Sequence, residues 1–230
     1  MAGEANSGAE QRIPLTRQRV LAAAVAVADE QGVHGLTMRK IADRLGVEAM
    51  SLYHHFGGKS EILDGMVDLV FDEVDPPDRS AGWRTALRDR AVSLRAALRR
   101  HPWAVGLMES RATPGPATLR HHDAAIGLLR EAGFSLVMTA HTVSVLDSYI
   151  YGFVLQEVNM PFEGAADLES VAAGIRRSIP AGEYPHFTEL MTDHALLPGY
   201  AYADEFTYGL DLILDGLANR HTEQSPPEHP

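Results

Sequence analysis

Residues 37–59 read TMRKIADRLGVEAMSLYHHFGGK, and this segment constrains the fold more than any other part of the chain. A short helix is predicted from Thr37 to Leu45, and Gly46 then supplies the left-handed residue that turns the chain. A second short helix is predicted over residues 48–55, and a pair of glycines follows it. Two short helices joined by a tight glycine turn are typical of a helix-turn-helix, which places its second helix in a DNA major groove.

The second helix of this pair has two different faces. Leu52 and Phe56 are four residues apart, so they share one face and can be buried together. The other face carries side chains that can hydrogen-bond to phosphates and base edges or touch thymine methyl groups. They are Ala49, Met50, Ser51, Tyr53 and His54. The alternative interpretation is a solvated helix of an all-α bundle, which the complete pattern from Thr37 to Lys59 disfavours.

The formal net charge of −11 is unusual for a DNA-binding protein, but the distribution of charge matters more than the total. Residues 12–59 contain seven basic and four acidic side chains, a formal charge of +3, which leaves −14 on the remainder. The two lysines of the chain, Lys40 and Lys59, both lie in this segment. A cationic segment on an anionic protein lets one end approach DNA. An excess of +3 is common, so the charge is consistent with DNA binding without deciding it.

The composition excludes several kinds of site. The chain has 230 residues and 45% apolar content, which suits one or two compact domains. The absence of cysteine excludes disulfides, thiolate zinc sites and cysteine nucleophiles, and it fits a cytoplasmic protein. The sequence has no long uninterrupted apolar stretch and no signal-peptide profile, so we expect no membrane partner and no secretion.

The rest of the chain shows helical periodicity without a convincing strand pattern, so the predicted fold is all-α. Besides the helix-turn-helix, helices are predicted over residues 16–31, 59–74, 83–100, 102–110, 116–132, 135–159, 164–178, 185–196 and 201–219. We expect a three-helix DNA-binding head at 13–58 and a larger helical domain at 59–220. Disordered segments are expected at 1–12 and 221–230.

Patterns for catalysis or metal binding are missing from the sequence. It contains no nucleotide-binding glycine loop, G-x-S-x-G or H-E-x-x-H, so we predict no enzyme, catalytic residue or cofactor. The pairs His54-His55 and His121-His122 would point about 100° apart on a helix, which is poor geometry for holding one ion. His141 lies in an apolar helix, where a hydrogen-bonded core histidine is more common than a ligand. We therefore predict no metal site.

One set of residues in the head segment carries a family resemblance. It comprises Thr37, Met38, Arg39, Ile41, Ala42, Leu45, Gly46, Val47, Leu52, Tyr53, Phe56, Lys59 and Leu63. This set strongly resembles the TetR family of bacterial transcriptional regulators, and the preceding TRQRVLAAAVAVADEQGVHGLT resembles the first helix of that family. The segments RRHPWAVGLMESR, LREAGFS and LDSYIYGFVLQE more loosely resemble the C-terminal domain of the tetracycline repressors.

The resemblance implies a homodimer whose two heads bind a near-palindromic operator, usually repressing a nearby gene. It also implies that residues 59–220 form a helical ligand-binding and dimerisation domain, and that a small molecule bound there releases the DNA. The DNA-contact residues implied by position are Thr37, Arg39, Ala49, Met50, Ser51, Tyr53, His54 and Lys59. Dimerisation is implied for the helices at 135–159 and 201–219, which carry wide apolar surfaces. The apolar residues expected there are Leu146, Ile150, Val154, Phe206, Leu210, Ile213, Leu214 and Leu217.

We expect the effector site among the helices between residues 83 and 159. The candidate lining residues combine large or adaptable apolar groups with a few polar anchors, which suits a largely apolar ligand or, equally, a simple core. They are Trp103, Met108, Ile126, Met138, His141, Tyr149 and Gln156. Tetracycline repressors hold a magnesium–drug chelate with a histidine and a glutamate, and the corresponding regions here contain Met108 and Gln156. This departure argues against tetracycline–magnesium binding.

A second function from a different class stays open at this point. The chain could be an all-α ligand-binding enzyme or interaction module whose helix-turn-helix serves packing alone. That interpretation predicts no DNA binding at all.

Overall fold

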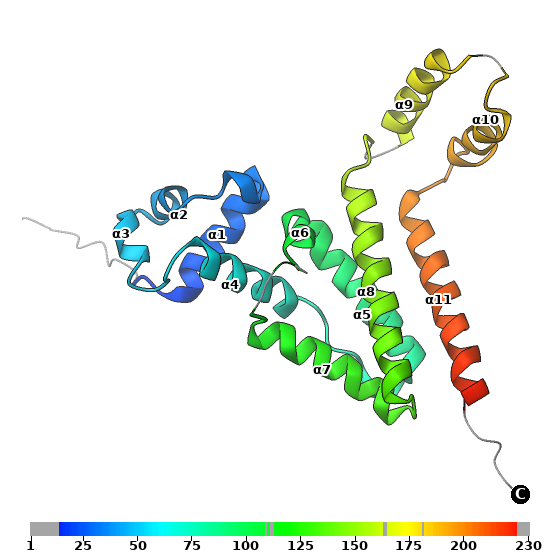
Figure 1. The fold of residues 1–230 in the computed structure, drawn as a ribbon. Helices are drawn as coiled ribbons and strands as arrows, with labels where there is room; N and C mark the ends of the chain where they lie inside the picture. Colours follow the sequence, from blue (N-terminus) through cyan, green and yellow to red (C-terminus); the bar gives the residue numbers. More distant parts are fainter. Residues whose placement is uncertain (1–13, 109, 111–112, 163–164, 181, 225–230) are drawn as a thin grey trace, which may run out of the picture. The chain divides into compact units, whose positions relative to one another are not determined.

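The computed structural model describes residues 14–108, 110, 113–162, 165–180 and 182–224. Within these ranges the chain forms α-helices, short 3₁₀ segments and one π-helical segment, with no strand, so the predicted all-α class is confirmed (Figure 1). The contacts divide the chain after Met66 into two compact units. The predicted disordered segment at 1–12 lies outside the described residues.

The first unit contains the predicted helix-turn-helix. Its elements are α1 (Arg17–Gln31), η1 (Val33–Gly35), α2 (Met38–Leu45), α3 (Ala49–Leu52) and the first part of α4 (Lys59–Asp72). Thr37 caps α2, because its side-chain oxygen accepts a hydrogen bond from the Lys40 amide at 3.2 Å. Gly46 ends α2 in the left-handed conformation with φ of +67°, as the turn requires.

The recognition helix α3 is shorter than predicted. It ends at Leu52, and the chain continues to His55 as a tight turn instead of a helix. The Tyr53 amide donates to the carbonyl of Met50, three residues back, which is the bond of a tightened last turn. Phe56 still returns to the core, because its amide bonds the Leu52 carbonyl at 3.0 Å.

Arg17 secures the end of this turn. Its guanidinium lies 4.1 Å from the centre of the Phe56 ring, donates to Glu61 at 2.6 Å and also donates to the His55 carbonyl. Glu61 accepts a further hydrogen bond from the Gly57 amide at 2.7 Å. The Gly57 amide and Arg17 together lower the pKa of the Glu61 carboxyl group.

The second unit contains the remaining helices. They are α5 (Trp83–Arg100), α6 (Val105–Met108), α7 (Pro116–Glu131), α8 (Leu136–Val158), α9 (Ala165–Ser178), α10 (Pro185–Leu190) and α11 (Tyr202–Gln224). Short 3₁₀ segments η2 (Arg79–Ala81) and η3 (Pro102–Ala104) precede α5 and α6, and the π-helical segment η4 (Met191–Ala195) continues α10. The predicted tail is wrong at residues 221–224, because α11 extends through them, and residues 225–230 lie outside the described chain.

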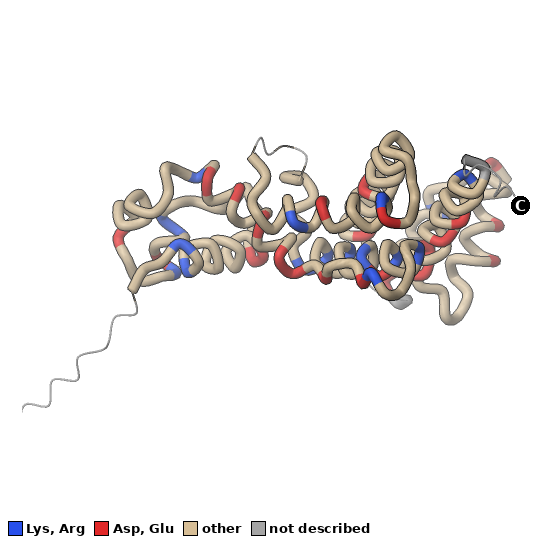
Figure 2. The backbone as a smooth tube through the Cα atoms, turned by 90° about the horizontal axis from the view of Figure 1, so that it is seen from below, with Lys and Arg blue, Asp and Glu red and all other residues tan. Residues whose placement is uncertain are grey.

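Three helices of this unit pack together, and α11 runs beside two of them. Helices α5, α7 and α8 contact one another, while α11 contacts α5 and α8 (Figure 1). Opposite charges line the contact between α5 and α11, and Figure 2 shows basic and acidic residues interspersed along the backbone. Arg84 pairs with Asp215 at 2.5 Å, and Arg88 pairs with Asp211 at 3.0 Å. These ion pairs join residues more than 120 positions apart, so they belong to tertiary packing.

Candidate DNA interface and ligand sites

The predicted DNA-contact residues lie on α2, α3, the turn after α3 and the start of α4. Arg39 has 88% of its side chain exposed, and the residues Met50 and Tyr53 are 70% and 49% exposed. Thr37 and His54 are also exposed, while Ala49, Ser51 and Lys59 are half-buried. Leu52 and Phe56, expected on the other face, are both buried. The segment from Ala49 to Phe56 therefore buries its apolar side and presents an aromatic and polar surface.

The basic residues of the head divide into two groups. Lys40 donates to Gln31 at 2.5 Å, and Arg44 pairs with Glu30 at 2.8 Å, so these two fasten α2 to α1. Arg39 only approaches Asp43, at 3.9 Å, and Lys59 forms no ion pair within the described residues. Lys59 is the first residue of α4, where free amide groups and the helix dipole favour an anion. Among these four residues of the described head, Arg39 and Lys59 are thus the cations available to a polyanion.

A polar cluster lies among α5, α7 and α8 of the second unit. Arg90 is only 2% exposed, and its Nη2 lies 3.5 Å from Oδ1 of Asp147. The Nε2 atom of His122 lies 3.7 Å from the other carboxylate oxygen of Asp147. Phe71 covers the cluster, with its ring centre 5.1 Å from that of His121 and 5.5 Å from that of His122. A guanidinium buried this deeply needs ion-pair and hydrogen-bond partners to compensate for its lost hydration.

Four buried side-chain polar atoms of α5, α7 and α8 lack a hydrogen-bond partner in the described structure. They are Nε of Arg90, Nε2 of His121, Oγ1 of Thr139 and Oγ1 of Thr142. Burial, helped by the charges of Arg90 and His122, lowers the pKa of His121 from 6.5 to about 3, so this imidazole is neutral near pH 7. Unpaired buried donors and acceptors are rare and call for water or a ligand.

The predicted ligand residues do not share one environment. Trp103 and Met138 are buried, Met108 and Tyr149 are half-buried, and Ile126, His141 and Gln156 are exposed. The Tyr149 hydroxyl donates to the carbonyl of Phe206 at 2.9 Å, which ties α8 to α11. The Oε1 atom of Gln156 accepts a hydrogen bond from the Tyr202 hydroxyl at 3.1 Å.

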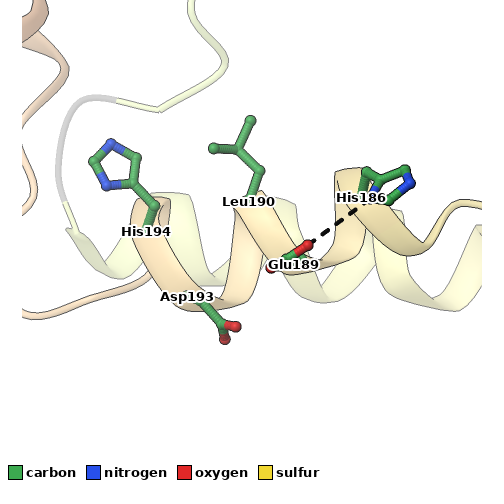
Figure 3. A pocket seen from close by; sticks show the side chains of 5 residues that line it. All are labelled: His186, Glu189, Leu190, Asp193 and His194. Atoms are coloured by element: carbon green, nitrogen blue, oxygen red, sulfur yellow. Dashed lines mark ion pairs between the residues drawn. The ribbon is translucent and has the colours of Figure 1, made fainter.

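Two adjoining cavities lie where α8 ends, α9 and α10 follow and α11 begins. Their volumes are about 640 and 230 Å³, and neither is lined by a predicted ligand residue. Both are lined by Met160, Phe162, Leu168, Tyr200 and Tyr202. A third, shallow hollow lies on α10 and η4 (Figure 3). There Asp193 points away from His186 and His194, and the described residues contain no group of three suitable metal ligands.

The residues expected at the dimer contact lie mainly inside the subunit. Leu146, Ile150, Val154, Phe206, Leu210, Leu214 and Leu217 are buried, and Ile213 is half-buried. The outward faces of the same two helices carry other apolar side chains. These are Leu136, Val137, Val145 and Leu155 on α8 and Tyr208 and Leu212 on α11. Both the inward and the outward face of each helix carry apolar side chains. The apolar pattern of the sequence therefore does not distinguish the positions that are buried in the subunit from those that face outward.

Comparison with known protein families gives a match for each of the two parts of the chain. Residues 20–66 match the family model described as bacterial regulatory proteins, tetR family, and residues 76–221 match the tetracyclin repressor-like C-terminal domain. The protein belongs to the TetR family. No helix in the described part of this TetR-family chain is long and apolar enough to cross a membrane.

Individual relatives agree with this assignment. The chain is 34% identical to the HTH-type transcriptional repressor DrrR1 of Streptomyces coeruleorubidus, over 92% of this chain and 82% of that protein. It is 31% identical to the class A tetracycline repressor of transposon 1721 from Escherichia coli, over 87% and 89% of the two chains. The crystal structure of ActR from Streptomyces coelicolor in complex with actinorhodin superposes with a TM-score of 0.73 at 26% identity, over 91% and 99%.

This TetR-family protein is a ligand-responsive, DNA-binding transcriptional repressor. Regulators of the family bind DNA operators, dimerise and bind small molecules, and they are generally not enzymes. The comparisons do not favour the alternative of a helical enzyme or interaction module with a purely structural helix-turn-helix.

Sequence reasoning missed the polar cluster, although one signal was present. Arg90 falls on the apolar face of α5, between the buried Leu87 and Leu94. A charged residue on the buried stripe of an amphipathic helix needs a partner. That partner, Asp147, is 57 residues away, so only the tertiary fold identifies it.

Proposed function

We propose that this repressor binds a near-palindromic operator as a homodimer and leaves it when an effector enters the interior of α5, α7 and α8. The single observation that carries the DNA-binding part of this proposal is the exposed surface of α3 and the turn after it, on the side opposite the buried Leu52 and Phe56. We place its site of action in the bacterial cytoplasm, on the nucleoid while it is bound to DNA.

In this proposal the residues of the head have separate roles. Tyr53 and Lys59 hold phosphates, with the N-terminus of α4 adding its own attraction for an anion. Arg39, Met50 and His54 read or abut base edges, because they are exposed on or beside the two helices of the motif. Thr37, Ala49 and Ser51 complete the surface from the cap of α2 and the inner side of α3.

The proposed dimer contact is the outward face of α8 and α11. Tyr208 and Leu212 stand four residues apart on α11 and are 67% and 57% exposed. Val137, Val145 and Leu155 are exposed on α8, which packs beside α11. A two-fold contact between these faces would bury them in a four-helix arrangement, with Leu146, Leu210 and their buried neighbours supporting the helices from behind. The half-sites should then lie roughly 34–36 Å apart or a little more.

The proposed effector site is the polar cluster, with apolar walls from buried residues of the same helices, such as Met138 on α8. Four buried atoms without partners support it, since a ligand with acceptor and donor groups would satisfy them. The crystal structure of ActR with actinorhodin supports a small organic molecule as effector. Magnesium chelation is not part of the proposal, because Glu157, the acid beside Gln156, already accepts two hydrogen bonds from Arg95.

The effector site has a physical connection to the end of α4. Asp68 accepts hydrogen bonds from the amides of Ala117 and Thr118, at 3.2 and 2.8 Å, and so caps α7. Asp72, one turn further along α4, pairs with Arg120 at 2.9 Å. A ligand that shifts α7 would therefore move α4, the helix that enters the head, and a coupling of about 1–3 kcal/mol would suffice for release.

The experiment uses the DNA upstream of the protein's own gene as a probe. Fluorescence anisotropy should show tight binding of the wild-type protein, and sedimentation should show a dimer. Leu212→Glu places a charge on the outward face of α11 and should abolish both, whereas Leu197→Glu, also exposed but outside the helices, should change neither. A Leu212→Glu monomer that still binds the full site tightly would contradict the proposal.

A further inference from the structure

The two adjoining cavities form a site that is separate from the proposed effector site. We call them together the arm cavity, defined by the shared lining residues Met160, Phe162, Leu168, Tyr200 and Tyr202. Its larger part, about 640 Å³, falls within the size range of small-molecule sites. No residue of the polar cluster lines either part.

The inner end of the arm cavity is apolar. The smaller part lies between α9, α10 with η4, and the start of α11, and its remaining lining residues carry no charge. They are Val171, Ala172, Ile175, Phe187, Leu190, Met191 and Ala195. The hydroxyls of Tyr200 and Tyr202 are the polar groups here, and burial raises the pKa of both, so they stay neutral. This end suits a hydrocarbon or aromatic body.

The outer end is lined by one basic and one acidic residue. Its charged lining residues are Arg99 and Glu157. Glu157 is already held by Arg95, which lies behind it and donates two hydrogen bonds, at 2.9 and 2.5 Å. Arg95 is itself fixed over the Phe206 ring, 4.7 Å from its centre. The carboxylate of Glu157 is thus shared by two guanidinium groups, those of Arg95 and Arg99.

Arg99 is the weaker partner of that carboxylate. Its Nε atom lies 3.4 Å from Oε1 of Glu157, and 56% of its side chain is exposed. The other acid close to the tyrosines, Glu205, faces His194 at 3.3 Å. Arg99 therefore lines the larger cavity while sharing Glu157 with Arg95, so its charge is only partly compensated, which favours an anionic group there.

We propose that the arm cavity binds an amphipathic organic anion, with the apolar body among Phe162, Leu168 and Tyr202 and the acidic group at Arg99. This site goes beyond the effector site and differs from it in chemistry. A neutral ligand would leave the charge of Arg99 uncompensated, and a cation would be repelled. A carboxylate or sulfonate on an aromatic or aliphatic body satisfies both ends.

The test uses two fluorescent probes with the same body. 8-Anilinonaphthalene-1-sulfonate carries a sulfonate, and N-phenyl-1-naphthylamine is the same molecule without it. Titrated against the full-length protein, the sulfonate probe should bind one site per chain roughly tenfold more tightly than the neutral probe, the scale of one charge-assisted contact. Equal affinities for the two probes would overturn the assignment of the charge.

Two variants and one matched control locate the site. Arg99→Gln should remove the preference for the sulfonate probe while leaving the neutral probe unchanged. Arg100→Gln is the control, because this neighbouring, equally exposed arginine pairs with Glu73 instead. Leu168→Trp fills the wall shared by both cavities and should weaken both probes. Retention of the preference in Arg99→Gln, or unchanged binding of both probes in Leu168→Trp, would overturn the proposal.

Discussion

The head and the body of this repressor are held together in different ways. In the head, local devices such as the Thr37 cap and the left-handed Gly46 define the ends of α2, and the clamp of Arg17 on Phe56 spans 39 positions of the chain. In the body, contacts between residues 50 to 130 positions apart do the same work, as in the pairs Arg84–Asp215 and Arg90–Asp147. The head needs a fixed surface in order to contact DNA. The body needs an interior whose side-chain contacts can rearrange when a ligand binds.

The largest expected effect tests whether the two units have separate cores. Phe56→Ala removes a buried ring of the head and should cost about 3–5 kcal/mol there. Trp83 and Trp103, the two tryptophans of the chain, both lie in the body. In a urea titration of Phe56→Ala, part of the helical circular dichroism signal should be lost at lower urea concentrations than in the wild type. The urea midpoint of the tryptophan fluorescence transition should stay unchanged. Leu94→Ala, in the body core, should shift the fluorescence midpoint instead.

A coincident shift of both signals in Phe56→Ala would contradict the separation of the cores. It would mean that head and body unfold as one cooperative unit.

The next effect concerns the polar interior of the body. Because burial lowers the pKa of His121 to about 3, the unfolded state binds a proton between about pH 6.5 and 3 that the folded state does not. The free energy of unfolding should fall as pH decreases below about 6.5. In His121→Gln this dependence should be shallower by up to about 1.4 kcal/mol per pH unit. Urea midpoints at pH 7 and 5 measure the difference, and identical pH profiles would place His121 in solvent.

A smaller effect sharpens the connection of α4 to α7. A Cβ atom on Gly115 would collide with the Asp68 carboxyl group, so Gly115→Ala should displace the cap of α7. Asp68→Ala removes the same cap, and each variant should cost about 1–2 kcal/mol. In a double-mutant cycle the second change should cost much less than it does alone. Strict additivity of the two losses would show that Gly115 and Asp68 act independently.

The sequence predicts the head more completely than the body. Thr37, Gly46 and the spacing of Leu52 and Phe56 are local signals, and the structure contains each of the features that they predict. The length of α3 was overestimated, since hydrogen bonds of the tight turn replace helical ones. These signals act over a few residues, so they can be read without tertiary information.

The body exposes the limit of this approach. Periodicity locates α8 and α11, but it cannot tell an apolar face that packs inward, such as Leu210 and Leu214, from one that faces outward, such as Leu212. The partner of Arg90 and the two cavities depend on contacts between distant segments. The amphipathic pattern contains no information about those pairings.

The most direct test of the account is the salt dependence of operator binding in two lysine variants. Lys59 is available at the start of α4, whereas Lys40 is held by Gln31 at 2.5 Å. Lys59→Ala should weaken binding to all sequences and lower the slope of log K against log salt by about one. Lys40→Ala should leave the slope unchanged. A Lys59→Ala protein with wild-type affinity and slope would contradict the assignment of this head surface to DNA.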